Sequence, residues 1–169
     1  MTKDYTIRTA TLKDAEVVTT LLTACYPVLM KGAYDAEVLA CALPLMTKAN
    51  PKLLASDTFY VAQSNDGRII GCGGWTHERP GTGEIEQGLA HIRHFATHPD
   101  WLGQGVARKL FEKCQTEAST QGAVQLECFS SLNAEGFYGA MGLKRQNVFD
   151  VQMGPDVRFP SVRMTSSSR

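Results

Sequence analysis

The stretch that decides the fold lies at residues 95–108 and reads Phe95-Ala96-Thr97-His98-Pro99-Asp100-Trp101-Leu102-Gly103-Gln104-Gly105-Val106-Ala107-Arg108. It joins a strand-like run to a segment with apolar residues at helical spacing. The small residues at positions 103, 105 and 107 let the backbone approach a ligand closely. The first N–H groups of a helix have no partner inside the helix, and the helix dipole attracts an anion to them. We therefore predict that residues 102–108 hold a diphosphate group.

Two other phosphate-binding patterns fit this loop poorly. The Walker pattern needs a lysine followed by serine or threonine after its last glycine, and Val106 and Ala107 stand there instead. The dinucleotide-binding fingerprint follows the first strand of a βαβ unit, whereas this loop lies deep in the chain. A plain helix start at a glycine-rich turn is the alternative that the loop alone leaves open.

The composition is that of a globular protein. The chain has 169 residues, of which 43% are hydrophobic and 20% charged, and this size suits one domain, which we place at residues 1–165 with a frayed tail at 166–169. Lys plus Arg and Asp plus Glu both number 17, so no basic field attracts nucleic acid or an anionic membrane. No apolar run has membrane-spanning length, and residues 1–11 lack the apolar stretch of a signal peptide.

The five cysteines are scattered along the chain and form no CxxC pair. Their odd number and wide spacing argue against a disulfide framework and against a metal site. We expect buried free thiols in a cytoplasmic protein that holds no metal.

Hydrophobic periodicity predicts seven strands and four helices. Thr11 is predicted to cap the first helix, with Asp14 as the acid of its capping box, and Pro27 is predicted to end that helix. The expected strands are Tyr5–Thr9, Thr58–Gln63, Ile69–Trp75, Ala90–Thr97, Val124–Phe129, Leu143–Met153 and Val162–Met164. The expected helices run from Thr11 to about Cys25, over Tyr34–Lys48 with an interruption near Pro44, from Gln104 to before Gly122, and over Asn133–Met141. Strand runs with few crossovers indicate an α+β domain with a mixed sheet.

Two blocks of the sequence resemble the motifs of the GCN5-related N-acetyltransferases. Residues 95–107 are similar to motif A of that family, a strand followed by Arg/Gln-x-x-Gly-x-Gly/Ala. A later block resembles the family's Phe-Tyr-x-x-x-Gly-Phe segment and reads Phe137-Tyr138-Gly139-Ala140-Met141-Gly142-Leu143. The spacing between the blocks leaves room for one helix and one strand, as the family requires.

The resemblance implies a fold and a co-substrate. The fold is a central mixed, mostly antiparallel sheet of six to seven strands with about four flanking helices and a splay between the two central strands. The co-substrate is acetyl-CoA, whose diphosphate binds residues 102–108. The family's Arg or Gln at the head of the loop is Leu102 here. Since the loop holds phosphate mainly through backbone N–H groups, binding need not depend on that side chain.

Tyr138 is the first candidate for a catalytic group. The resemblance implies that this tyrosine faces the sulfur of CoA and acts as general acid toward the departing thiolate. A phenol with a pKa near ~10 is a reasonable proton donor to a thiolate. The alternative is that Phe137 and Tyr138 form an aromatic pair that packs their helix onto the sheet.

His91 is the candidate general base. Some relatives carry a glutamate four residues before the hydrophobic residue that corresponds to Phe95, and His91 stands at that place. Strand alternation places His91, Arg93 and Phe95 on one face and Ile92, His94 and Ala96 on the other. Imidazole titrates near neutral pH and suits proton removal, directly or through water. An ordinary strand histidine remains the alternative, with Glu84, Glu86 and the weaker His77 as rival bases.

The remaining site residues are expected along the same strand and around the acceptor. The backbone of Phe95, Ala96 and Thr97 is expected to hydrogen-bond the pantetheine arm as an added strand does. The resemblance places the acceptor near the first two helices and the Glu78 to Gly88 loop. Tyr34 and Trp75 are candidates for its walls, and Glu84 and Glu86 for attracting a cationic amine; core packing and a solvated loop are the respective alternatives.

These observations favour an N-acetyltransferase that moves an acetyl group from acetyl-CoA to a primary amine of a small molecule or peptide by direct attack. A non-catalytic acyl-CoA sensor is the alternative. A different nucleotide-binding enzyme is disfavoured by the absence of a Walker or dinucleotide-binding context. A sheet edge or the C-terminal hairpin offers a surface for a homodimer.

Overall fold

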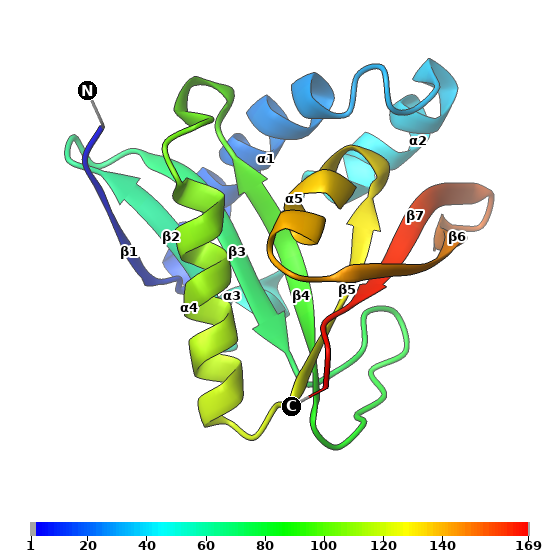
Figure 1. The fold of residues 1–169 in the computed structure, drawn as a ribbon. Coiled ribbons are helices and arrows are strands. Elements are labelled where there is room, and N and C mark those ends of the chain that lie inside the picture. The colour runs from blue at the N-terminus through cyan, green and yellow to red at the C-terminus, as the bar shows by residue number, and fades with distance from the viewer. Residues whose placement is uncertain (1–2, 169) are drawn as a thin grey trace.

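One sheet organises the molecule. The computed structural model describes residues 3–168, and in them seven strands follow the order β1-β2-β3-β4-β5-β7-β6 (Figure 1). Only β4 and β5 run parallel among these neighbours, so the predicted mixed, mostly antiparallel sheet is confirmed. The strands are β1 (Tyr5–Thr9), β2 (Phe59–Ser64), β3 (Ile69–Thr76), β4 (Leu89–Thr97), β5 (Gln125–Ser131), β6 (Lys144–Gly154) and β7 (Val157–Thr165).

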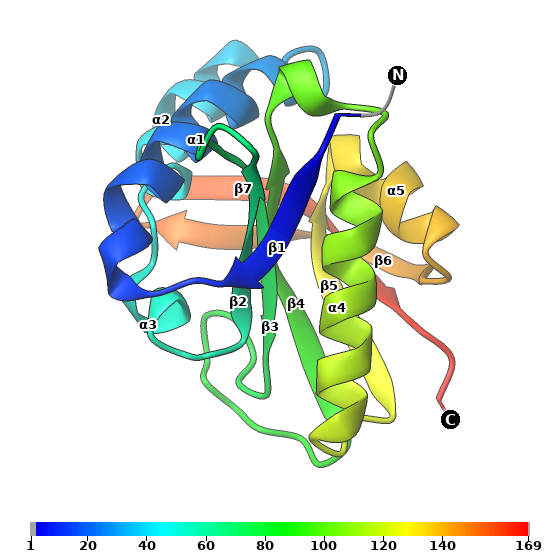
Figure 2. The same cartoon turned by 90° about the vertical axis from the view of Figure 1, so that its left-hand side faces the viewer.

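Helices cover both faces of the sheet. They are α1 (Ala15–Leu29), α2 (Ala36–Met46), α3 (Pro51–Leu54), α4 (Val106–Thr120) and α5 (Glu135–Ala140). Figure 2 shows α1, α2 and α3 on one side of the sheet and α4 and α5 on the other. Each side has its own hydrophobic cluster: Leu110 and Phe111 of α4 belong to one, and Leu22 and Cys25 of α1 to the other.

The start of the first helical segment follows the prediction and its end does not. Thr11 and Asp14 form the predicted capping box, at a short 3-10 helix (Leu12–Asp14) that leads into α1. The prediction that Pro27 ends the helix is wrong, because α1 continues to Leu29 and the Met30 N–H still donates to the Tyr26 carbonyl at 2.9 Å. Pro27 removes the bond that an N–H at this position would donate to the Thr23 carbonyl, but helical bonding continues at Met30. The last turn of α1 reaches the sheet through the Tyr26 hydroxyl, which donates to the Phe95 carbonyl of β4.

β4 and β5 part along their length. Their parallel pairing covers four residue pairs and ends at Ile92 and Cys128. Beyond that point β4 continues to Thr97 along β3, and β5 continues to Ser131 along β7. In Figure 1 the two strands lie side by side near the bottom and diverge toward the top. The splay between the central strands, which the family resemblance implied, is present.

A β-bulge in β4 overturns one prediction about side-chain direction. Between the pairs Cys72–Ala96 and Gly74–Arg93, the two residues His94 and Phe95 oppose Gly73 alone. His94 has a φ of 51°, in the left-handed region that is uncommon for residues other than glycine. The extra residue reverses the alternation.

The faces of β4 therefore differ from those predicted. Phe95 lies with Ile92 in the cluster under α4, whereas Ala96 belongs to the cluster under α1. His91 and Phe95 were expected on one face and lie on opposite faces, since the neighbours of His91, Ala90 and Ile92, both belong to the α4 side.

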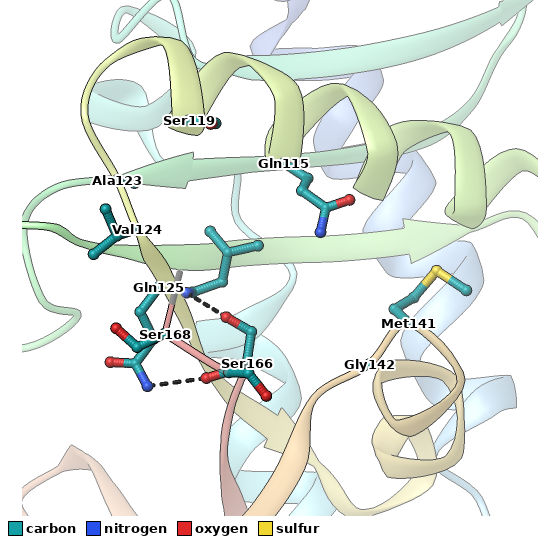
Figure 3. Close-up of a pocket in the computed structure, with 11 residues that line it drawn as sticks. Gln115, Ser119, Ala123, Val124, Gln125, Met141, Gly142, Ser166 and Ser168 are labelled. Atoms are coloured by element: carbon teal, nitrogen blue, oxygen red, sulfur yellow. Dashed lines mark hydrogen bonds between the residues drawn. The ribbon is translucent and has the colours of Figure 1, made fainter.

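The C-terminal end of the chain also departs from expectation. Ser166 was expected in a frayed tail, but its backbone N–H donates to Leu126 at 2.9 Å and its hydroxyl accepts from the Leu126 N–H at 2.8 Å (Figure 3). Arg169 lies outside the described residues.

Four of the cysteines are buried as expected, while Cys41 on α2 is exposed.

Candidate functional site

A cleft of about 480 Å³ lies where β4 and β5 part. The segment from Ile92 to Thr97 forms one side and Cys128 to Ser131 the other. Further walls come from the end of α1, from α5 and from the β6–β7 hairpin. The lining residues outside the two strands are Tyr26, Leu29, Met30, Met46, Pro80, Leu102, Ala107, Asn133, Ala134, Phe137, Tyr138, Val151, Met153, Phe159 and Ser161. The cleft thus connects the two faces of the sheet through the splay.

The glycine loop lies at the end of this cleft nearest to α4. Gly103 and Gly105 have φ values of 76° and 77°, which glycine adopts without strain. Among the described residues, none accepts a hydrogen bond from the backbone N–H groups of residues 103–108. Leu102 and Ala107 line the cleft itself. Free amide hydrogens at a helix start form an anion site that needs no charged side chain.

The N-terminal segment, Lys3 together with Tyr5 of β1, supports this loop from outside. The Tyr5 hydroxyl donates to the Gln104 carbonyl at 3.2 Å, and the Lys3 N–H donates to Gln104 Oε1 at 3.2 Å. The ammonium groups of Lys3 and Lys109 lie over the rings of Trp101 and Tyr5. Their positive charge adds to that of the helix dipole at the loop.

Tyr138 lies inside the cleft and is 5% exposed. Burial, followed by the neighbouring Cys128 and Tyr26, raises the pKa of its phenol well above 10. Because this shift favours the neutral form, Tyr138 keeps its proton at all physiological pH values. Its ring also contacts Phe95 and Phe137, with centroids 6.1 and 5.1 Å away. Tyr138 therefore also forms an aromatic pair with Phe137 and packs its helix against β4, as the alternative interpretation predicts.

Two carbonyls of β4 are tied to α1. The Tyr26 hydroxyl donates to the Phe95 carbonyl at 3.2 Å, and Cys25 Sγ donates to the Thr97 carbonyl at 2.9 Å. Phe95, Ala96 and Thr97 all line the cleft. These bonds hold the bulged end of β4 in place beside the opening.

His91 lies outside the lining of the cleft. It is 2% exposed, and its Nδ1 is 3.2 Å from Oε1 of Glu127, its register partner on β5. Arg163 contacts the other carboxylate oxygen at 2.8 Å, and Arg79 lies 3.7 Å from Oε1. Burial lowers the pKa of His91. His91 and Glu127 are thus buried in an ion cluster with Arg79 and Arg163, and neither of the two lines the cleft.

The residues predicted to form the acceptor site and the rival bases also lie outside the lining of the cleft. The Trp75 indole is in the core and donates to the Tyr60 hydroxyl at 3.1 Å. The Tyr34 hydroxyl donates to the Pro160 carbonyl at 2.6 Å and accepts from the Leu132 N–H at 2.8 Å. Glu84 and Glu86 are exposed in the loop between β3 and β4. His77, in the same loop, packs edge-on against Trp75.

Two basic residues that line the cleft, Arg93 and His94, have no role among the sequence-based predictions. Burial, then the Arg93 charge, lowers the pKa of His94 to about 4, so its imidazole is neutral at pH 7. The β-bulge is what turns this part of β4 toward the opening. A run of two glycines opposite the bulge, Gly73 and Gly74, is the one signal of irregular backbone here, and it does not specify where the extra residue falls.

The neutral state of His94 has a consequence for stability. Because its pKa is lowered in the folded chain, the unfolded chain binds the extra proton between pH 6.5 and 4. The free energy of unfolding should therefore decrease as the pH is lowered through this window, by up to about 1.4 kcal/mol per pH unit for this one proton. His94→Asn tolerates the same backbone angle and removes the titration. Urea unfolding of both proteins at several pH values should show the wild-type free energy of unfolding falling more steeply toward acid pH than that of the variant; parallel curves would contradict the assignment.

A second, smaller pocket lies elsewhere. It has a volume of about 240 Å³ and is lined by Gln115 and Ser119 of α4, by Met141 and by the serines that follow β7 (Figure 3). These residues of α4 are in its second half, away from the glycine loop.

No group of three His, Cys, Asp or Glu residues with metal-site geometry occurs in the described part of the chain. Among the same residues, no helix has the length and apolar character needed to cross a membrane.

Residues 34–154 match the family model of the acetyltransferase (GNAT) domain. No curated protein matches the sequence. Among solved structures, a GCN5-related N-acetyltransferase from Rhodopseudomonas palustris superposes with a TM-score of 0.75 at 20% identity, covering 99% of this chain and 98% of that one.

Two further structures contain coenzyme A. The PaiA N-acetyltransferase of Thermoplasma acidophilum, in complex with coenzyme A, has a TM-score of 0.72 at 15% identity and covers 97% of this chain and 99% of that one. The N-acetylglutamate synthase of Neisseria gonorrhoeae, with coenzyme A and N-acetyl-glutamate, has a TM-score of 0.61 at 15% identity; 98% of this chain matches 35% of that one. These likenesses establish the fold, and the family model matches well over half of the sequence. The chain belongs to the GNAT family of acetyltransferases, which use acetyl-CoA as co-substrate.

Proposed function

We propose that this protein transfers the acetyl group of acetyl-CoA to a primary amine by direct attack of the amine on the thioester. The observation that carries the proposal is the joining of two features in one cleft. Unpaired amide hydrogens lie at its α4 end, and a buried, protonated tyrosine lies within it. The first feature suits a diphosphate and the second suits a departing thiolate.

The cofactor is assigned a path along this cleft. Residues 103–108 bind the diphosphate through their backbone N–H groups. The pantetheine arm then runs beside β4 at Phe95 to Thr97, where the strand has no partner from β5. An extended amide-containing chain fits such an unpaired strand edge as an added strand does. This path brings the thioester into the splay, near Tyr138.

The reaction forms one bond, breaks one bond and moves three protons. The neutral amine attacks the thioester carbonyl, the C–S bond breaks, and Tyr138 donates its proton toward the departing sulfur. The proton released from the attacking nitrogen leaves to water, because His91, Glu84 and Glu86 do not line the cleft, and water returns a proton to the Tyr138 phenolate. No covalent acyl-enzyme is required.

The test combines binding with turnover. Acetyl-CoA at about 100 times its dissociation constant should add about 2.7 kcal/mol to the free energy of unfolding. NAD and ATP at the same concentration should add far less, and this is read as a shift in Tm. Thiol release from acetyl-CoA in the presence of a panel of primary amines measures the transfer. A shift with acetyl-CoA and no thiol release with any amine would indicate a sensor, and no shift at all would contradict the proposed cofactor site.

A further inference from the structure

The lining of the cleft carries a single positive charge and no negative one among the described residues. It contains no Asp or Glu among the described residues, and Arg93 is the one side chain there that is charged at neutral pH. His94 is the other basic residue of the lining, and its imidazole is neutral because its pKa is about 4. A cleft for a simple cationic amine would be expected to carry a carboxylate. This one carries a guanidinium instead.

Arg93 lies where the splay begins. It follows Ile92, the last residue of β4 that pairs with β5, and it points to the face opposite α4, as its register partner Gly74 and the neighbouring cluster membership of Ile92 require. One hydrogen bond holds the guanidinium, from Nη1 to Thr76 Oγ1 at 3.1 Å. A guanidinium has five N–H donors. Among the described residues, no carboxylate forms an ion pair with it.

Several other arginines of the chain form ion pairs with carboxylates. Arg163 and Arg79 both contact Glu127, and Arg145 forms a double hydrogen bond with Glu135. Burial lowers the pKa of Arg93, although Glu78 acts in the opposite direction without forming an ion pair. A partly buried guanidinium without a carboxylate is costly, so its retention in a cleft suggests an anion that arrives with a ligand.

The phosphates of the co-substrate do not fill this role. Their proposed site is the N-terminus of α4, and α4 covers the other face of the sheet. Arg93 instead lies on the α1 side of the sheet, the side to which the cleft residues Met30 and Phe159 also belong. That side is the one from which an acceptor must approach, because the acetyl donor enters from the α4 side.

We propose, resting on the acetyl transfer proposed above, that the acceptor is a primary amine that also carries a carboxylate, and that Arg93 binds this carboxylate through paired N–H···O bonds. The planar guanidinium matches a carboxylate in geometry as well as in charge. Apolar residues that line the same cleft, Leu29, Met30, Phe129, Val151 and Phe159, suit an acceptor with an apolar body. Amino acids with apolar side chains have all three features.

Matched pairs of acceptors test the inference. Each pair is an amino acid and the amine left after its decarboxylation: phenylalanine with phenethylamine, leucine with isoamylamine, and methionine with its decarboxylated amine. Thiol release gives kcat/KM for both members. We expect the wild-type protein to favour the carboxylated member by about tenfold or more, the size expected for a charge-assisted pair. Arg93→Gln should remove that preference mainly through KM, and Arg93→Lys should restore part of it.

The controls separate this inference from the proposed function. Arg158→Gln removes one positive charge from an exposed position on β7 and should leave the preference unchanged. The shift in Tm with acetyl-CoA should be the same for wild type and Arg93→Gln. The difference in reactivity between the free amines is common to all variants and cancels in the comparison. An equal loss for both members of each pair in Arg93→Gln, or no turnover of any carboxylated amine, would overturn the inference. The acetyl-CoA shift would then show whether the cofactor site stands.

Discussion

Replacing Tyr138 by phenylalanine is expected to lower kcat by about 100-fold, the lower range for loss of a general acid. The ring, with its contacts to Phe95 and Phe137, stays in place, and only the hydroxyl that donates to the departing sulfur is lost. The dissociation constant for acetyl-CoA should stay within about twofold, because the hydroxyl acts only as the thiolate forms. Single-turnover thiol release and acetyl-CoA titration measure the two quantities separately.

Tyr60→Phe is the matched control for this variant. The Tyr60 hydroxyl accepts a hydrogen bond from the Trp75 indole in the core, outside the cleft, so its removal costs stability by about 1 kcal/mol and should leave kcat unchanged. If both variants lose turnover equally, the loss reflects packing, not proton donation. If Tyr138→Phe keeps wild-type turnover, the hydroxyl has no part in the reaction.

The high pKa of Tyr138 does not disqualify it as a donor. Cys128 lines the same cleft, and burial raises the pKa of its thiol to about 12. A CoA thiolate released into that environment is destabilised for the same reason, so it too becomes a stronger base than in water. The two groups are therefore better matched than their values in water indicate. Because Tyr138 keeps its proton far above neutrality, its ionisation should cause no loss of activity below pH 10.

The sequence predicted the parts of the site that depend on backbone pattern. The positions of Gly103 and Gly105 ahead of an amphipathic helix were sufficient to predict a loop with free N–H groups. The splay between β4 and β5 followed from the family resemblance. In both cases the determining feature is the order and spacing of elements, which the chain carries locally.

The parts that failed depend on a single inserted residue and on tertiary placement. Strand alternation holds only while the register is regular, and the bulge at His94 broke it without a local sign, since a histidine within a strand does not by itself specify a φ of 51°. Because of that one shift, the prediction put Phe95 on the same face as His91, whereas it lies on the opposite face. The shift also concealed that Arg93 and His94 line the cleft. The burial of His91 against Glu127 depends on a pairing between strands 36 residues apart in sequence, which no local pattern reveals.

Gly105→Glu is expected to abolish the stabilisation by acetyl-CoA and to weaken its binding by about 100-fold or more. Two physical effects act together at this position. A side chain at a φ of 77° is strained by about 1 kcal/mol or more, which disturbs the turn that presents the N–H groups. The added carboxylate also repels the diphosphate at the site where the helix dipole would otherwise attract it. The shift in Tm with acetyl-CoA and a direct titration both report the loss.

Gly122→Glu separates the loss of the site from the loss of stability. Gly122 follows α4 with a φ of 94°, and a Cβ there meets no atom within 4 Å, while a Cβ at Gly105 would meet only the Tyr5 hydroxyl, at 3.8 Å. The variant therefore carries the same kind of backbone strain and the same added charge at the opposite end of the same helix. It should lower Tm in the absence of ligand at least as much as Gly105→Glu, since a carboxylate is unfavourable at a helix C-terminus. Its acetyl-CoA affinity should nevertheless be normal. If Gly105→Glu binds as tightly as Gly122→Glu, the diphosphate lies elsewhere, and the first amide groups of α4 have no ligand in this reaction.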